Sequence, residues 1–206
     1  MSIQDERYRD CTFASYDTSE RGQSKAVAQC RDYVVHASEN FKRGRSILFI
    51  GPVGTGKDHL MIATMRAIIR AYKLDDISIS PDFTLADRSV RHVDGSRLYE
   101  RYREAIRGVP TTAQLDELYT SELLHWLAIS DPIPAGIAEL SEYEQKTLFR
   151  IVDARYRARL PMFITANVAD RSELESRVGH QVADRLCDDA LTVKCYWKSY
   201  RQKASL

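Results

Sequence analysis

The eight residues from Gly51 to Asp58 combine the residue types that bind a phosphate chain. They read Gly-Pro-Val-Gly-Thr-Gly-Lys-Asp and lie between a short apolar run and a helical pattern that begins at Lys57. Glycines allow consecutive backbone N–H groups to face one concavity, the next helix N-terminus adds partial positive charge, and the lysine reaches the terminal phosphates. A glycine turn before an ordinary helix is disfavoured because strand, glycines, lysine and helix occur in this order. We therefore predict a P-loop that binds ATP through Gly51, Pro52, Val53, Gly54, Thr55, Gly56, Lys57, Asp58 and His59.

Two carboxylates are predicted to hold magnesium beside the phosphates. Asp58 stands where the P-loop pattern has Ser or Thr, whose hydroxyl binds Mg²⁺, and a carboxylate can hold that ion directly or through water. Asp131 follows an apolar strand and Ser130, where P-loop ATPases carry an acidic residue that holds Mg²⁺ or polarises the attacking water. The sequence does not decide between these two roles for Asp131, and an acidic turn after a strand is the structural alternative.

Three further polar residues are candidates because of their places in the chain. Asn167 follows another apolar strand, where it either orients a water near the γ-phosphate or is an ordinary turn residue. Arg185 lies in a helical segment beside Asp184 and Asp188, whose carboxylates are its expected partners. Arg201, near the C-terminus, is typical of a surface charge when it is taken alone.

Apolar runs alternate with helical patterns along the chain, which predicts an α/β fold. Such an alternation forms a parallel sheet with helices on both faces, and ligands bind beyond the carboxyl ends of the strands. We expect a three-layer fold with a mainly parallel five-stranded sheet, its strands at 46–50, 77–80, 126–129, 162–166 and 191–195. The expected helices are 23–37, 57–72, 95–106, 115–124, 141–159 and 173–186. We divide the chain into an N-terminal extension and helix, residues 1–44, and a P-loop core, residues 45–206.

The composition is that of one ordinary soluble domain. The 206 residues are 44% hydrophobic, and 30 Lys and Arg balance 29 Asp and Glu, which excludes a strongly basic nucleic-acid protein. The four cysteines lie far apart and favour free thiols in a reducing compartment. No apolar run is long enough to span a membrane, and the charged start is unlike a secretion signal. We expect a cytoplasmic protein with no membrane partner.

Several motifs together resemble the DnaC/IstB group of AAA+ ATPases, from about Tyr8 to Arg201. The resemblance implies an AAA+ P-loop fold and an ATPase that uses ATP and Mg²⁺. It also implies assembly on copies of itself and on single-stranded DNA, where such proteins load a replicative helicase or assist a transposase. The motifs are the P-loop with His59-Leu60, the strand before Asp131, Leu148-Phe149-Arg150-Ile151-Val152-Asp153-Ala154-Arg155-Tyr156, Pro161 with Thr165-Ala166-Asn167, Ala183-Asp184-Arg185-Leu186, and Trp197-Lys198-Ser199-Tyr200-Arg201.

The resemblance also implies roles for particular residues. Lys57 is implied as the phosphate lysine, and Asn167 as the sensor of the γ-phosphate. Arg185 is implied as an arginine finger that acts on the ATP of a neighbouring subunit, and Arg201 as a second sensor that acts within its own subunit. A finger supplied in trans gives a physical reason for self-association through Arg185, because one subunit alone cannot complete the charge clamp around the transition state. With Asp131, these residues are the predicted catalytic set.

The chain also departs from the family pattern. Helicase loaders carry a segment before the ATPase domain that grips the helicase, and we expect this chain to lack it because it begins almost at that domain. The acidic strand end is altered by Ser130 and Pro132. Asp58 and Ser130 favour a second interpretation, a nucleotide-gated binding module with little or no hydrolysis. A third, a small-molecule kinase on the same scaffold, is disfavoured by the motifs around Arg185 and Arg201.

Residues 88–107 contain arginines interleaved with two tyrosines, Tyr99 and Tyr102. Arginines in this pattern can follow the phosphates of single-stranded DNA while the aromatic rings stack on its bases. A solvated amphipathic helix is the alternative interpretation. The arginines are Arg88, Arg91, Arg97, Arg101, Arg103 and Arg107.

Overall fold

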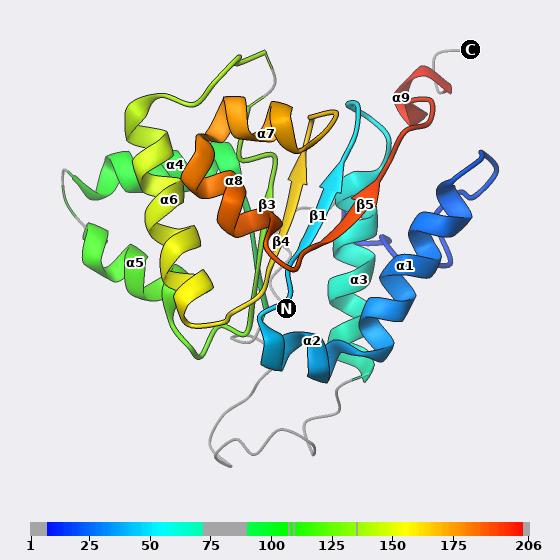
Figure 1. Cartoon of the computed structure of the whole chain (residues 1–206), viewed down its shortest axis with the longest axis horizontal. Coiled ribbons are helices and arrows are strands. Elements are labelled where there is room, and N and C mark those ends of the chain that lie inside the picture. The colour runs from blue at the N-terminus through cyan, green and yellow to red at the C-terminus, as the bar shows by residue number, and fades with distance from the viewer. Residues whose placement is uncertain (1–7, 72–89, 107, 109, 135, 204–206) are drawn as a thin grey trace.

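The computed structural model describes residues 8–71, 90–106, 108, 110–134 and 136–203, and these contain one sheet of five strands. The strand order is β2-β3-β4-β1-β5, and every neighbouring pair is parallel. Figure 1 shows β4, β1 and β5 side by side. The predicted α/β fold class with a five-stranded parallel sheet is confirmed. The strands are Ile47–Ile50 (β1), Val90–Asp94 (β2), Trp126–Ser130 (β3), Met162–Ala166 (β4) and Leu191–Lys194 (β5).

The second strand was not predicted from the sequence. The expected strand at 77–80 lies outside the described residues, whereas β2 lies in a segment to which we assigned no strand. β2 pairs with β3 at one edge of the sheet, and its sequence is Val-Arg-His-Val-Asp. Because an edge strand needs less apolar surface than a central one, this short polar sequence gives almost no periodic signal.

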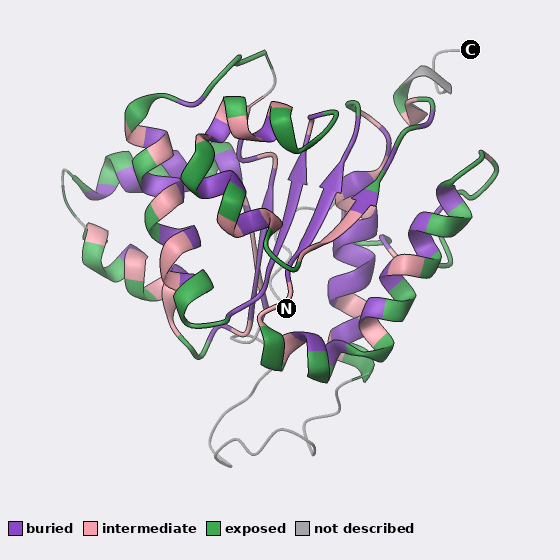
Figure 2. Cartoon of the chain, viewed as in Figure 1, coloured by how far each residue is buried: buried purple, intermediate pink, exposed green. Residues whose placement is uncertain are grey.

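The sheet separates two hydrophobic cores. In β1, Leu48 and Ile50 face one core while Ile47 and Phe49 face the other, as the alternation of side chains along a strand requires. Every residue of β1, β3 and β4 is buried (Figure 2). Burial on both faces explains why these strands appear in the sequence as continuous apolar runs.

Helices cover both faces of the sheet and complete the three layers. Helices α1 to α3 pack on one face, and helices α4 to α8 cover the other (Figure 1). The helices are Gln23–Val35 (α1), Ala37–Arg43 (α2), Lys57–Ala71 (α3), Gly95–Ala105 (α4), Thr112–Thr120 (α5), Glu142–Arg157 (α6), Arg171–Val178 (α7), His180–Cys187 (α8) and Tyr200–Lys203 (α9).

Two of the expected helices are each divided in two. The expected helix 23–37 is interrupted at His36, and the expected helix 173–186 is interrupted at Gly179. Gly179 has a φ of 87°, which is incompatible with a continuing right-handed helix. The long helix α6 begins where we expected it, at a capping box between Ser141 and Glu144.

A buried arginine holds α6 to the starts of two strands. Arg155 has no exposed surface, and its guanidinium donates to the backbone carbonyls of Tyr119, Leu124, His125 and Pro161. Burial lowers the pKa of Arg155 to about 9, because the charged form loses hydration. The partners of the Arg155 guanidinium are backbone carbonyls and not a carboxylate. These hydrogen bonds fix α6 against the loops that lead into β3 and β4.

Residues 8–43 are built into the same fold as the P-loop. Tyr8, Cys11 and Tyr16 are buried in the core that also contains Phe49 and Leu60. Helix α1 packs against α3, the helix that follows the P-loop. The division of the chain at residue 44 remains a prediction.

Candidate nucleotide site

The P-loop begins at the end of β1 and lies tightly against the end of β5. Gly51 has a φ of 142°, and a Cβ added to it would lie 2.3 Å from the Cys195 carbonyl oxygen, so only glycine fits. The loop ends at Lys57, where α3 begins. A strand, a glycine-rich loop and a helix N-terminus therefore meet as expected, in an arrangement that binds phosphate in other proteins.

The Lys57 side chain is buried and makes three hydrogen bonds. Its Nζ donates to the Gly51 carbonyl at 2.9 Å, to the Pro52 carbonyl at 2.7 Å and to Asn167 Oδ1 at 2.7 Å. Asn167 in turn donates from Nδ2 to Asp131 Oδ1 at 3.1 Å. Three predicted site residues, from the P-loop and from the ends of β4 and β3, thus form one continuous hydrogen-bonded chain.

The two predicted metal ligands lie on either side of a threonine hydroxyl. Thr165 Oγ1 donates to Asp58 Oδ1 at 2.7 Å and accepts the backbone N–H of Asp131 at 3.0 Å. The other Asp58 oxygen, Oδ2, accepts the Tyr8 hydroxyl at 3.3 Å. The hydroxyl that a standard P-loop carries at position 58 is absent from this loop, and a hydroxyl from the neighbouring strand β4 lies beside the carboxylate.

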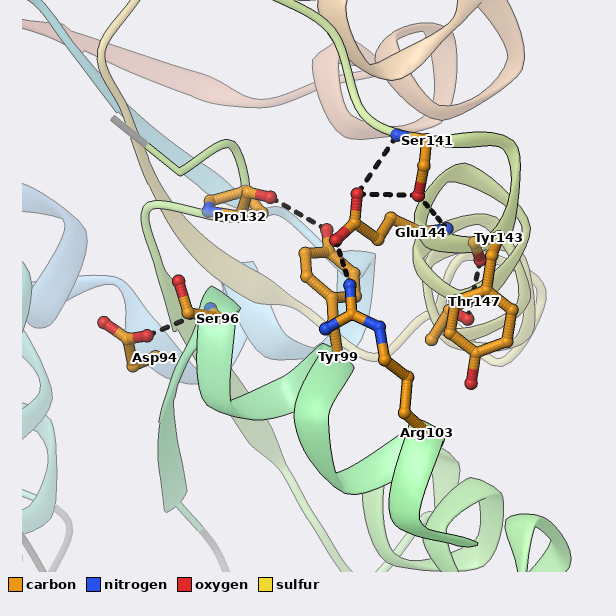
Figure 3. A network of polar contacts seen from close by, with 9 residues as sticks. All are labelled: Asp94, Ser96, Tyr99, Arg103, Pro132, Ser141, Tyr143, Glu144 and Thr147. Atoms are coloured by element: carbon orange, nitrogen blue, oxygen red, sulfur yellow. Dashed lines mark hydrogen bonds and ion pairs between the residues drawn. The ribbon is translucent and has the colours of Figure 1, made fainter. Parts of the chain in front are cut away.

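Strand β2 and helix α4 fix the position of Asp131. A Cβ added to Gly95 would lie 2.5 Å from the Asp131 carbonyl oxygen, so the first turn of α4 packs directly on the turn after β3. The Tyr99 hydroxyl donates to the Pro132 carbonyl at 2.8 Å (Figure 3). Sequence reasoning missed the contributions of Gly95, Tyr99 and Thr165, because no local motif marks contacts between segments so far apart in the chain.

Burial and a neighbouring like charge raise the proton affinity of the Asp131 carboxylate. Desolvation is the larger cause and the Asp58 carboxylate the second, and together they raise the pKa of Asp131 to about 6 against the opposing effects of Lys57 and Asn167. Burial also lowers the pKa of Lys57, an effect that the Asp131 charge opposes. The charged form of the buried Asp131 carboxylate is therefore disfavoured within the chain, and a bound cation would stabilise it.

Asp131→Asn is expected to stabilise the chain near neutral pH. The pKa of Asp131 is higher in the folded chain than its ordinary value of 3.8, so stability falls as the pH rises from about 4 to about 6. Asparagine removes this cost of about 1–2 kcal/mol, allowing for partial exposure. Thermal unfolding at about pH 4 and pH 7 measures it: the gain should appear only near neutrality, and an equal effect at both pH values contradicts the assignment. The control is Asp184→Asn, which removes an exposed ion pair with Arg171.

The C-terminal segment lies against the P-loop. The Gly54 carbonyl accepts the backbone N–H of Tyr200 at 2.9 Å, and the Thr55 carbonyl accepts the indole N–H of Trp197 at 2.8 Å. These bonds place the start of α9 beside the loop. Arg201 is exposed on α9, at the same end of the sheet as the phosphate cradle, which is compatible with its predicted role as a sensor within its own subunit.

The N-terminal segment covers another side of the same region. The Tyr16 hydroxyl donates to the Thr55 carbonyl at 3.1 Å. The His59 ring packs on the edge of Tyr16, with 5.1 Å between ring centroids, and its Nε2 lies 2.9 Å from the Thr12 carbonyl oxygen. His59 therefore contacts the N-terminal segment, and its contact with nucleotide remains a prediction.

The structure does not bring Arg185 to the P-loop of its own chain. Arg185 lies on α8 and lines a cleft of about 460 Å³ together with Ser46 and Met162, which lie at the starts of β1 and β4. The P-loop follows the opposite end of β1. Because a strand advances about 3.3 Å per residue, the length of the sheet separates Arg185 from Lys57.

The expected pairing of Arg185 with Asp184 or Asp188 is wrong. Arg185 Nε donates to Asp153 Oδ1 on α6 at 2.7 Å. Asp184 instead accepts from Arg171 at 2.9 Å. Asp184 directly precedes Arg185 on the helix and therefore points in a different direction, while Asp188 accepts the Tyr156 hydroxyl at 2.8 Å. The side chain of Arg185 is directed towards α6.

Stacking of DNA bases on the two tyrosines of residues 88–107 is excluded. Tyr99 is 1% exposed and Tyr102 has no exposed surface, because both lie on the core side of the amphipathic helix α4. Arg103 of the same helix is paired with Glu144 at 2.6 Å (Figure 3). Binding of single-stranded DNA remains a prediction, but the tyrosines of α4 cannot contribute to it by stacking on bases. Two of the arginines lie outside the described residues, Arg88 and Arg107.

Comparison with known proteins by sequence finds no matching family model and no matching curated protein. Comparison of folds does find matches. The DnaC helicase loader superposes with a TM-score of 0.74 at 22% identity, over 93% of this chain and 99% of that one. The chain has the fold of a DnaC-type AAA+ domain. The resemblance that we drew from its motifs is thereby confirmed at the level of the fold.

Two other solved structures, of DnaI and of a DnaA, share this DnaC-type fold. DnaI has a TM-score of 0.67 at 14% identity, with 96% of this chain and 94% of that chain covered. AMPPCP-bound DnaA from Aquifex aeolicus also has a TM-score of 0.67, at 16% identity, over 98% of this chain and 54% of that chain. The chain thus spans about half the length of that DnaA. Within the part that the structure describes, no helix is both long enough and apolar enough to cross a membrane.

Proposed function

We propose that this protein is an ATP-binding AAA+ protein of the DnaC/IstB type that uses ATP binding and hydrolysis to assemble in DNA replication or transposition. The observation that carries the proposal is the hydrogen-bonded chain from Lys57 through Asn167 to Asp131. It joins a phosphate-binding lysine to two polar strand ends beyond the carboxyl edge of a parallel sheet, where α/β proteins bind ligands.

Lys57 and the P-loop bind the phosphates in this proposal. All three N–H groups of an ammonium are donors, and within the chain those of Lys57 are directed to two carbonyls and to Asn167. A phosphate oxygen forms a stronger, charge-assisted hydrogen bond than a carbonyl does. We infer that ATP takes over one or more of these donors while Asn167 stays close enough to sense the γ-phosphate.

The residues at this edge also fit a magnesium ion. No group of three or more acidic, histidine or cysteine side chains gathers as a metal site in the described parts of the chain. Mg²⁺, however, is commonly held by one or two carboxylates together with substrate phosphates, and Asp58 and Asp131 provide such a pair. When bound, the ion would neutralise charge on the phosphates. The pKa of Asp131 is raised first by burial and second by the Asp58 carboxylate, and a cation bound by both carboxylates would oppose these two effects.

Hydrolysis requires a water positioned opposite the leaving group, and the chain supplies two groups for that purpose. Asn167 and Asp131 are hydrogen-bonded to each other, so a water placed between them and the γ-phosphate would be oriented by an amide and polarised by a carboxylate. Arg201 is proposed to act within its own subunit. These roles rest on the position of each residue relative to the P-loop.

Arg185 is proposed to complete the site of a neighbouring subunit. It lies near the starts of β1 and β4, at the end of the strands opposite the P-loop. A catalytic role for it therefore needs a second copy of the chain. An arginine finger of this kind contributes on the order of a thousandfold or more to the rate. Self-association therefore follows from the proposal as a catalytic requirement.

Single-stranded DNA and a helicase or transposase are the proposed partners. A DnaA with the same fold has been solved with AMPPCP and single-stranded DNA, at 16% identity and a TM-score of 0.67. The DnaC neighbour is a helicase loader. These neighbours support the class of partner.

A steady-state ATPase assay with and without single-stranded DNA tests the proposal. We expect hydrolysis above that of a Lys57→Ala control, with a higher rate when DNA is added. Tight ATP binding without turnover in either condition would favour the second function, a nucleotide-gated binding module. The observation behind that alternative is Asp58, whose carboxylate is already hydrogen-bonded to Thr165 and Tyr8.

A further inference from the structure

Asp153 on α6 lies between two arginines. Its Oδ1 accepts Arg185 Nε at 2.7 Å, and its Oδ2 pairs with Arg157 Nε at 3.0 Å. The side chains of Asp153 and Arg185 are 14% and 23% exposed, whereas that of Arg157 is 74% exposed. Exposed ion pairs contribute little and half-buried charge-assisted hydrogen bonds contribute more. The main partner of Asp153 is therefore Arg185.

Three further contacts restrain the same guanidinium. Its carbon lies 5.0 Å from the centroid of the Phe149 ring and 5.9 Å from that of Tyr156, and its Nη1 donates to the Gln181 carbonyl at 3.1 Å. The aromatic rings hold the cation through their π faces. Arg185 is thus fixed at Nε and Nη1, while its Nη2 makes no hydrogen bond to any residue that the structure describes.

Arg185 lines an open cleft, and some of its N–H donors form no hydrogen bond within the described residues. A guanidinium has five N–H groups, and two of them are accounted for by Asp153 and Gln181. The cleft of about 460 Å³ is lined by further arginines and by two aspartates, Asp188 and Asp189, of which Asp189 pairs with Arg43 at 2.7 Å. The free guanidinium donors of Arg185 at this cleft are suited to a phosphate group.

We propose that Asp153 is a positioning residue for Arg185. It holds the guanidinium by Nε, and thereby directs the remaining N–H groups to a phosphate of the ATP that is bound by a second copy of this chain. This inference rests on the proposed action of Arg185 in trans. The arrangement pre-organises the arginine, so the neighbouring site gains a fixed cation without ordering a flexible side chain.

Removal of Asp153 should lower the turnover rate and leave nucleotide affinity unchanged. A displacement of about 1 Å at a catalytic group costs up to about a hundredfold in rate, so we expect Asp153→Ala to lower kcat about tenfold to a hundredfold. KM for ATP should stay the same, because the P-loop of the same chain lies at the other edge of the sheet. Asp153→Asn keeps the shape and one acceptor, and should lose less.

The test is a mixing experiment in which one protein provides the pocket and the other provides the arginine. Arg185→Ala protein supplies the pocket in both mixtures. Its partner is either the Lys57→Ala protein or the double variant Lys57→Ala with Asp153→Ala. We expect the first mixture to recover ATPase activity and the second to recover about tenfold to a hundredfold less. The series is repeated with Asp153→Asn in the double variant, which keeps the test valid if the alanine variant does not fold.

The outcomes separate this inference from the proposed function. Failure of the first mixture overturns the action of Arg185 in trans, and the Asp153 inference with it. Equal recovery in both mixtures overturns the Asp153 inference alone. Asp184→Asn, on the same helix as Arg185, removes an exposed ion pair with Arg171 and should keep the wild-type rate; a loss equal to that of Asp153→Ala would show a general effect of disturbing α8, which also overturns the inference.

Discussion

Lys57→Ala is expected to weaken the binding of a fluorescent ATP analogue by about a hundredfold or more. The lysine is 5% exposed, and its ammonium is the cation that we propose for the phosphate cradle. Loss of a charge-assisted pair in a buried site costs about 3 kcal/mol or more, which corresponds to about two orders of magnitude in affinity. Equilibrium titration of the wild type and the variant, with magnesium present, measures the difference.

The matched control for this experiment is Lys198→Ala. Lys198 is exposed and lies in the segment that packs on the P-loop, so its removal tests whether the loss of any nearby positive charge has the same effect. The affinity of the Lys198→Ala variant for the ATP analogue should equal that of the wild type. Lys57→Ala also leaves the Gly51 carbonyl without the Lys57 donor, at a cost of about 1–3 kcal/mol in stability, whereas the Pro52 carbonyl keeps the Thr55 hydroxyl as its donor. The titration therefore needs a temperature at which circular dichroism shows both variants folded. Unchanged affinity in the folded variant would exclude the P-loop as the nucleotide site.

The parts of the site that could be predicted are those whose chemistry is local in the sequence. Glycines, a lysine and a helix start lie within eight residues between Gly51 and Asp58, and their spacing alone determines how the backbone can face a phosphate. The strands that end at Asp131 and Asn167 are buried on both faces, so they appear as apolar runs whose carboxyl ends meet at one edge. The local pattern and the parallel topology together place four predicted residues at the carboxyl ends of the strands: Lys57, Asp58, Asp131 and Asn167.

The parts that could not be predicted depend on contacts between distant segments. Thr165 supplies a hydroxyl to Asp58 across 107 positions of the chain, and no spacing rule connects the two. The edge strand β2 carries too few apolar residues to be distinguished from a charged loop. Arg185 has aspartates near it in the sequence, yet its partner Asp153 is 32 positions away, because the direction of a helical side chain is decided by the packing of α8 on α6.

Arg185→Ala is expected to bind ATP like the wild type and to lose hydrolysis by on the order of a thousandfold. The arginine lies near the starts of β1 and β4, at the end of the strands opposite the P-loop, so its removal spares the nucleotide pocket of its own chain. The loss falls on the transition state in the neighbouring subunit, where a finger stabilises the charge on the transferring phosphate. Asp184→Asn, on the same helix and in an exposed ion pair, is the control for a general effect on α8.

The most direct measurement is the ATPase activity of Arg185→Ala protein mixed with Lys57→Ala protein. The first keeps a sound pocket and the second keeps a sound arginine, so neither alone should hydrolyse ATP at an appreciable rate. If the site is completed between two copies of the chain, the mixture recovers part of the wild-type activity, with a maximum at an intermediate ratio. If no ratio recovers activity, and the wild-type protein stays monomeric in saturating ATP, then Arg185 is only the helix arginine that pairs with Asp153, and the account of an ATPase assembled in trans is wrong.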